Sequence, residues 1–253
     1  MLFNQIIYGP IHSRRFGNSL GINLMPTNCK LCTFNCIYCE CGYNTPVNNP
    51  QLPTPQQVKQ QLLLTLKALN TPIDVITFSG NGEPTLHPQF LQIIQDTINI
   101  RNQFAPNAKI TVLSNSTQLY RPDVLKALQL IDNPVLKLDS AIKHTFQLID
   151  QPVNQQLTPQ QIISYLKSFN SNFTLQICFL KNPDNAQPHI DNTTQQELNA
   201  LYNAINILKP KQIMIYCIDR LTPMTNLQKI KPETMNLIAQ QLQQQGHKVS
   251  VSL

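Results

Sequence analysis

The chain has 253 residues, 42% of them hydrophobic and 13% charged, a composition that can bury a core and does not indicate disorder. No run approaches the roughly 18 consecutive apolar residues that a membrane span needs, and the N-terminus does not read as a signal peptide. The formal net charge of +6 suits nucleic acid or an anionic cofactor, and equally a soluble enzyme with a slightly basic surface. We therefore expect a single cytoplasmic domain over residues 1–253 that does not contact a membrane.

Short β-rich runs alternate with helical patterns along the chain. Most of these runs are nearly continuous in apolar residues, as expected for parallel strands that are covered on both faces. The predicted strands span residues 20–24, 75–78, 110–113, 135–138, 174–180 and 212–218.

Helix starts are marked between these strands. Residues 54–57 and 158–161 both read Thr-Pro-Gln-Gln, which predicts an N-cap threonine, proline at the first helical position and a capping-box glutamine. Thr194 and Glu197 repeat the box. Further helix starts are predicted at Pro88, Pro122 and Pro232, and the end of the last helix at Gly246. Six β–α pairs in succession predict an α/β fold, either an incomplete barrel or a flat doubly wound sheet.

Five of the seven cysteines fall within residues 29–41, ahead of an Asn- and Pro-rich loop at about 44–55. Clustered thiols in a reducing compartment indicate metal or redox chemistry rather than disulfides. Structural zinc usually needs two ligand pairs separated by a dozen or more residues, whereas only three residues separate Cys32 from Cys36. A redox pair of Cys36 with Cys39 would leave Cys32 unexplained. The spacing Cys32-x3-Cys36-x2-Cys39 fits one compact loop around an iron–sulfur cubane with one iron left open. Cys29 and Cys41 are interpreted as bystander thiols, with a second metal role as the alternative, and Cys178 and Cys217 as small buried apolar residues.

A glycine-rich motif, Ser-Gly-Asn-Gly-Glu-Pro over residues 79–84, follows the second predicted strand. Gly80 and Gly82 would let the backbone approach a ligand closely, and Glu83 adds a carboxylate at the same strand end. In isolation the motif is equally compatible with an ordinary glycine turn before a helix.

Together the two motifs, in this order and with Tyr38 directly before Cys39, resemble those of the radical S-adenosylmethionine (SAM) superfamily. Residues 9–23, 137–139 and 216–223 make the chain similar to short members related to the wyosine synthases, which modify guanosine in transfer RNA. The resemblance implies an incomplete (β/α)6 TIM-like barrel with parallel strands. It also implies a [4Fe–4S] cluster that cleaves SAM reductively to a 5′-deoxyadenosyl radical for hydrogen abstraction.

The resemblance implies roles for individual residues. The expected cluster ligands are Cys32, Cys36 and Cys39, and the expected SAM-binding residues are Tyr38, Gly80, Gly82, Glu83, Pro84, Ser114, Asn115, Ser116, Asp139 and Gln176. Residues 114–116 are equally readable as a polar turn after a strand. Lys137 and Asp139 share one strand face, and they fit either a cofactor or substrate role or a buried structural ion pair.

Two further residues are candidate catalytic groups. Lys137 is a candidate for a Schiff base with a keto substrate, and Arg220, beside Asp219, for the substrate mouth. A small basic group at residues 12–15 would bind a phosphate or carboxylate, or pair with acidic residues.

Several functions stay open at this point. The expected partners are a flavodoxin- or ferredoxin-like electron donor and a transfer RNA or small-molecule substrate. One alternative is a protein-modifying enzyme such as a glycyl-radical activase. Another is a non-catalytic iron–sulfur or zinc-binding interaction protein, against which Glu83 argues because a structural metal site needs no such carboxylate.

Overall fold

The computed structural model describes residues 2–13 and 15–253, which form two compact units. The first comprises Met1–Cys32, Asn44–Ser114 and Gln118–Val135, and the second Thr33–Tyr43, Asn115–Thr117 and Leu136–Leu253. Arg14, part of the predicted basic group, lies outside the described residues, and the single-domain organisation stays a prediction. No helix of the described part of the chain has the length and apolar character needed to cross a bilayer.

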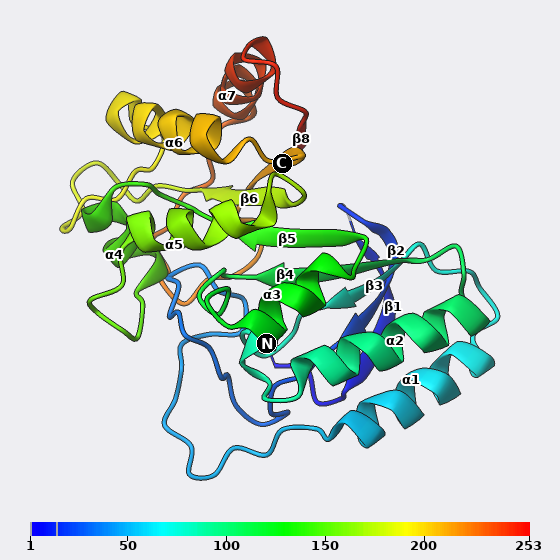
Figure 1. Ribbon diagram of the computed structural model, residues 1–253. Coiled ribbons are helices and arrows are strands. Elements are labelled where there is room, and N and C mark those ends of the chain that lie inside the picture. The colour runs from blue at the N-terminus through cyan, green and yellow to red at the C-terminus, as the bar shows by residue number, and fades with distance from the viewer. Residues whose placement is uncertain (1, 14) are drawn as a thin grey trace. The chain divides into compact units, whose positions relative to one another are not determined.

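The strands of the first unit are β1 (Ile7–Ser13), β2 (Gly17–Ile22), β3 (Val75–Phe78) and β4 (Lys109–Ser114), in that order (Figure 1). β1 pairs with β2 in an antiparallel hairpin, whereas β2, β3 and β4 pair in parallel. All four residues of β3 are buried, as expected for a parallel strand covered on both faces.

The helices of the first unit are α1 (Pro55–Ala68), the 3-10 turn η1 (Pro84–Leu86), α2 (Phe90–Phe104) and α3 (Pro122–Gln129). Thr54 caps α1 with both halves of the predicted capping box, and Pro122 opens α3 as predicted. The prediction that Pro88 opens α2 is wrong by two residues. The 3-10 turn continues into a hydrogen bond from the Phe90 amide to the His87 carbonyl, so Gln89 becomes the N-cap.

The second unit contains the end of β5 (Asn133–Lys137) and the parallel strands β6 (Thr174–Phe179), β7 (Gln212–Cys217) and β8 (Val249–Ser252). Its helices are α4 (Lys143–Asp150), α5 (Pro159–Leu166), η2 (Lys167–Phe169), α6 (Gln195–Leu208) and α7 (Pro232–Gln244). Thr158 forms the complete predicted capping box at α5. At α6, Thr194 caps the Glu197 amide, but the Glu197 carboxylate accepts a hydrogen bond from Ser140 at 2.7 Å.

The predicted α/β class is confirmed. Parallel strands follow the chain order with helices between them, which is the strand order of an incomplete TIM-like barrel. All six predicted strands are present. The structure adds β1, β8 and α4, which the sequence patterns did not predict.

Candidate functional site

The glycine-rich motif docks the segment that leads into the cysteines. The Leu31 amide donates to the Asn81 carbonyl at 2.9 Å, and the Glu83 amide donates to the Leu31 carbonyl at 3.0 Å, which makes a short parallel bridge between Leu31 and Gly82. A Cβ at Gly82 would lie 1.8 Å from the Leu31 carbonyl oxygen, and φ is +144°. Only glycine fits there. The close approach that the sequence predicts for a ligand is therefore made by the backbone just before Cys32.

The two residues before Gly82 contact other segments of the first unit. Gly80 has φ of +138°, and a Cβ there would lie 2.6 Å from the Asn23 side-chain oxygen. The Asn81 side chain is fully buried and donates to the carbonyls of Phe3 and Pro26, both at 2.7 Å. Its oxygen accepts from the Phe3 amide at 2.8 Å. Asn81 is thus a structural anchor, a role that the sequence did not indicate.

Glu83 is 2% exposed and is held in one orientation. Its Oε1 accepts from the Thr85 amide at 3.1 Å, the Thr85 hydroxyl at 2.5 Å and the Ser114 hydroxyl at 2.9 Å. The buried Pro84 opens η1 and leaves Glu83 as its N-cap. These three donors are neutral groups. A buried carboxylate gains most from a cationic partner, so this arrangement suits an ammonium group of a ligand.

In the second unit, the turn after β4 fastens Thr33 of the cysteine loop. The Asn115 side-chain amide donates to the Thr33 hydroxyl at 2.8 Å, and the hydroxyls of Thr33 and Thr117 lie 2.8 Å apart. The Asn115 oxygen also accepts from the Thr117 amide, and Ser116 adopts a φ of +71°. These contacts favour the polar-turn interpretation of Asn115 and Ser116. A cofactor role for these residues stays a prediction.

A buried charge cluster surrounds the second predicted cysteine ligand. The Lys137 ammonium lies 3.0 Å from the Cys36 sulfur, 2.5 Å from Asp150 Oδ1 and 3.1 Å from Asp139 Oδ2. The ion pair of Lys137 with Asp139, one of the two alternatives for these residues, is therefore formed. Asp150 was not predicted, because it ends the unpredicted helix α4.

The protonation states in this cluster follow from burial and charge. Burial alone would lower the pKa of Lys137, but the facing carboxylates of Asp139 and Asp150 outweigh it and hold that pKa well above its usual value. A Schiff base requires a neutral amine, so this environment does not favour that role. Burial raises the pKa of Tyr38, and Asp139, which accepts its hydroxyl hydrogen bond, raises it further.

Asp139 and Gln176 are engaged with the protein itself. Asp139 Oδ1 accepts a hydrogen bond from the Cys178 backbone amide at 2.8 Å. The Gln176 side-chain amide donates to the Met214 sulfur at 3.5 Å. Both residues are buried. Contacts of either residue with a cofactor stay predictions.

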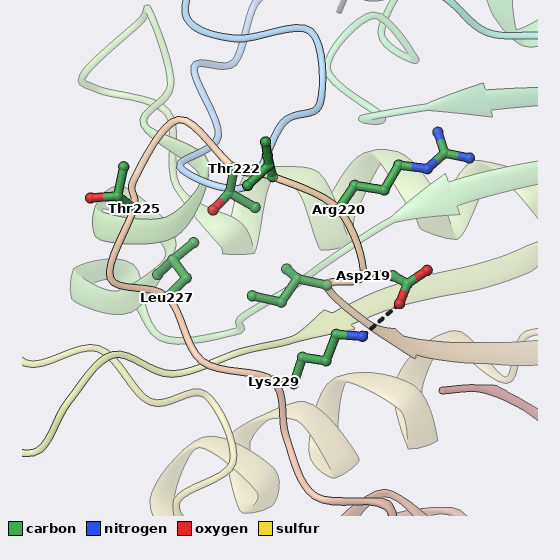
Figure 2. Close-up of a pocket in the computed structure, with 8 residues that line it drawn as sticks. Asp219, Arg220, Thr222, Thr225, Leu227 and Lys229 are labelled. Carbon is green, nitrogen blue, oxygen red and sulfur yellow. Dashed lines mark hydrogen bonds and ion pairs between the residues drawn. The ribbon is translucent and has the colours of Figure 1, made fainter.

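A surface pocket of about 500 Å³ opens after β7 (Figure 2). Arg220 and Asp219 lie on it, which is where the sequence placed a substrate mouth. Arg220 pairs with Glu40 of the cysteine loop at 2.6 Å, and Asp219 pairs with Lys229 at 2.5 Å. The pocket is lined by Ile218, Asp219, Arg220, Leu221, Thr222, Thr225, Leu227 and Lys229.

None of the seven cysteines, all of which lie in the described part of the chain, is assigned to a disulfide bond. Cys32 belongs to the first unit, and Cys36 and Cys39 belong to the second. Over residues 2–13 and 15–253, no three His, Cys, Asp or Glu side chains converge as a ready metal site, so the ligand roles stay predictions. The remaining cysteines Cys29, Cys178 and Cys217 are buried, whereas Cys41 is half-buried.

The residues present nevertheless fit the expected cofactors. Cysteine sulfurs in one short loop are suitable donors for iron. Beside the glycine-rich motif, the side-chain amide of Asn23 is buried, and no partner for it is found among the described residues. Together with the oriented Glu83 carboxylate, this gives the motif polar groups suited to a ligand.

Comparisons with known proteins identify the family of the chain. A family model described as the radical SAM superfamily matches residues 29–181, which is more than half of the chain. A UPF0026 protein of Helicobacter pylori strain J99 is 34% identical over 183 residues, covering 70% of this chain and 56% of that protein. The chain thus spans about half the length of this curated relative.

Two solved structures share the fold. Streptococcus suis SuiB bound to S-adenosylmethionine matches with a TM-score of 0.65 at 14% identity, over 92% of this chain and 50% of that chain. The structure of TYW1 with a lysine–pyruvate adduct bound matches with a TM-score of 0.63 at 14% identity, over 89% and 73%. Identities this low show a common fold and nothing further.

Proposed function

Because the chain belongs to the radical SAM superfamily, we propose that Cys32, Cys36 and Cys39 hold its [4Fe–4S] cluster and that Glu83 binds the amino group of SAM. The chain is an enzyme of this class, and the cluster and SAM are its cofactors. When bound, they supply a 5′-deoxyadenosyl radical by one-electron cleavage of the S–C5′ bond. The residues of this chain hold, orient and shelter that chemistry.

The observation that carries this proposal is the bridge between Leu31 and Gly82. It places the residue that precedes Cys32 against the residue that precedes Glu83. A thiolate for iron and a carboxylate for an ammonium group thereby follow directly from one pair of hydrogen-bonded backbones. An ordinary glycine turn has no need of that pairing.

We propose guanosine in transfer RNA as the substrate, with modification of the wyosine type. The net charge of +6 favours an anionic partner, and the resemblance of residues 9–23, 137–139 and 216–223 supports this class. Arg220 and Lys229 at the pocket after β7 would meet such a substrate. A flavodoxin- or ferredoxin-like donor would supply the electron, in a reducing compartment such as the cytoplasm, because the cluster ligands must be thiolates.

Cleavage of SAM is tested after anaerobic reconstitution. With dithionite and SAM, the protein should form 5′-deoxyadenosine, and Cys36→Ala should abolish it. Cys217→Ala, which alters a buried thiol in β7, is the matched control and should retain activity. A reducible cluster on the wild-type protein that yields no 5′-deoxyadenosine would refute the proposal.

The substrate is tested with transfer RNA from a strain that lacks the gene. Under turnover, a guanosine-derived nucleoside of altered mass should appear in the digested RNA and require SAM. Unchanged RNA, together with a glycine-centred radical on a copurified protein, would instead support the activase alternative.

A further inference from the structure

Three charged side chains and a thiol gather in the second unit, at the end of β5. Lys137 is the last residue of that strand, Asp139 follows two residues later, and Asp150 ends α4. The Asp139 and Asp150 side chains are 0% and 1% exposed, and the Lys137 side chain is 11% exposed. A cluster this deeply buried must satisfy its charges internally.

The ammonium group of Lys137 has an acceptor for each of its three hydrogens. These are Asp150 Oδ1 at 2.5 Å, Asp139 Oδ2 at 3.1 Å and the Cys36 sulfur at 3.0 Å. Two carboxylates would already neutralise a lysine. The third contact, with the Cys36 sulfur, is therefore not needed to neutralise the lysine. A sulfur that ligates iron carries negative charge, and an N–H donor stabilises that charge.

Two aromatic rings of the cysteine loop also contact the Lys137 ammonium. The ammonium lies 4.8 Å from the centre of the Tyr38 ring and 5.4 Å from that of Phe34. Both rings come from the same short segment as Cys36. The lysine is thus held by contacts with the same loop as the cysteine whose sulfur it contacts.

The balance of charge gives the lysine a function beyond structure. When Asp139 and Asp150 are both ionised, one ammonium against their two carboxylates leaves one negative charge in excess. A thiolate at Cys36 adds another, because its S–H, which faces Asp150 Oδ1 at 3.6 Å, is lost when it ligates metal. The ammonium of Lys137 is the group that contacts all three anions.

We infer that Lys137 is a positioning residue for Cys36: its ammonium donates an N–H to the ligand sulfur and stabilises the reduced, more negative state of the bound cluster. Donors to ligand sulfurs and nearby cations both raise the reduction potential of an iron–sulfur cluster. The inference rests on the cluster and not on any substrate. It assigns Lys137 to electron transfer into the site instead of to a Schiff base.

The test measures the midpoint potential of the reconstituted cluster by EPR-monitored redox titration at pH 8.5 without SAM. Lys137→Gln removes the cation and should shift the potential to a more negative value. Asp150→Asn is nearly isosteric, removes an anion from the same cluster, and should shift the potential to a more positive value. Lys143→Gln changes an exposed lysine at the start of α4 and should leave the potential unchanged.

Opposite signs at Lys137 and Asp150 distinguish an electrostatic role from a merely structural one, because a loosened loop would move both variants the same way. A wild-type potential in Lys137→Gln, or shifts of the same sign in both variants, would overturn the inference. If Lys137→Gln fails to fold or to hold iron, Lys137→Met, an uncharged variant of similar length, takes its place: a negative shift supports the role, and no shift overturns it. The titration stays readable even where SAM cleavage fails, so the two proposals fail separately.

Discussion

Replacing Gly82 by alanine tests how tightly the glycine-rich motif is fitted to the cysteine loop. The added Cβ would lie 1.8 Å from the Leu31 carbonyl oxygen and 2.5 Å from its carbonyl carbon. Both contacts are with backbone, which has no rotamer to give way. We expect the bridge to open in Gly82→Ala.

The expected loss of stability follows from the hydrogen bonds that break and the backbone strain that is added. Two backbone hydrogen bonds, at 2.9 and 3.0 Å, are lost, and each contributes about 1 kcal/mol. A non-glycine residue at a φ of +144° adds strain of about 1–3 kcal/mol. We therefore expect Gly82→Ala to lower the free energy of unfolding of the apo-protein by about 3–5 kcal/mol.

The assay is urea unfolding of the apo-protein, with iron content after reconstitution as the second measurement. Gly246→Ala is the matched control, because Gly246 has φ of +88° and a Cβ there meets nothing within 4 Å. It should show only the strain cost of about 1–3 kcal/mol and bind iron normally. Equal losses of stability in both variants, or full iron content in Gly82→Ala, would refute the role of the bridge.

Four more results are expected. Glu83→Gln should weaken SAM binding roughly 10- to 100-fold in equilibrium dialysis, since a charged hydrogen bond contributes about 1.5–3 kcal/mol; unchanged affinity would remove Glu83 from the site. Asn81→Ala should cost about 2–4 kcal/mol in urea unfolding, because it deletes the three hydrogen bonds of a buried side chain, and a loss under about 1 kcal/mol would contradict that. Burial lowers the pKa of His87, so the unfolded chain takes up a proton first and stability should fall as pH drops below about 6.5; His87→Gln should flatten this dependence between pH 8 and 5.5. Arg220→Ala breaks an exposed pair with Glu40 and should change the unfolding free energy by less than about 1 kcal/mol, so a larger loss would make this pair structural.

The sequence predicted the elements whose signals are local. Continuous apolar runs identified the parallel strands, and Thr-Pro-Gln-Gln identified the starts of α1 and α5, because a capping box needs no partner outside its own four residues. β1 was not predicted because its sequence, Ile-Tyr-Gly-Pro-Ile-His-Ser, is interrupted by Gly-Pro and alternates poorly. β8, with four half-buried residues, is too short for a periodic signal.

The candidate site likewise contains residues that local sequence patterns predict and residues that they do not. The motif positions of Gly82 and Glu83 can be predicted from spacing. The contact of Gly82 with Leu31 joins residues that are far apart in the sequence, and no local pattern encodes it. Asp150 was missed because its helix carries no cap signal, as Ile142 is the N-cap and makes no side-chain bond there. A lone acid at the end of an otherwise apolar turn, Leu-Ile-Asp, was the one available indication.

The bridge at Leu31 also bears on how the enzyme acquires its iron. It is made by backbone atoms alone. The Leu31 side chain takes no part in the bridge, and insertion of the cluster should accordingly tolerate substitution at position 31 while remaining intolerant at position 82.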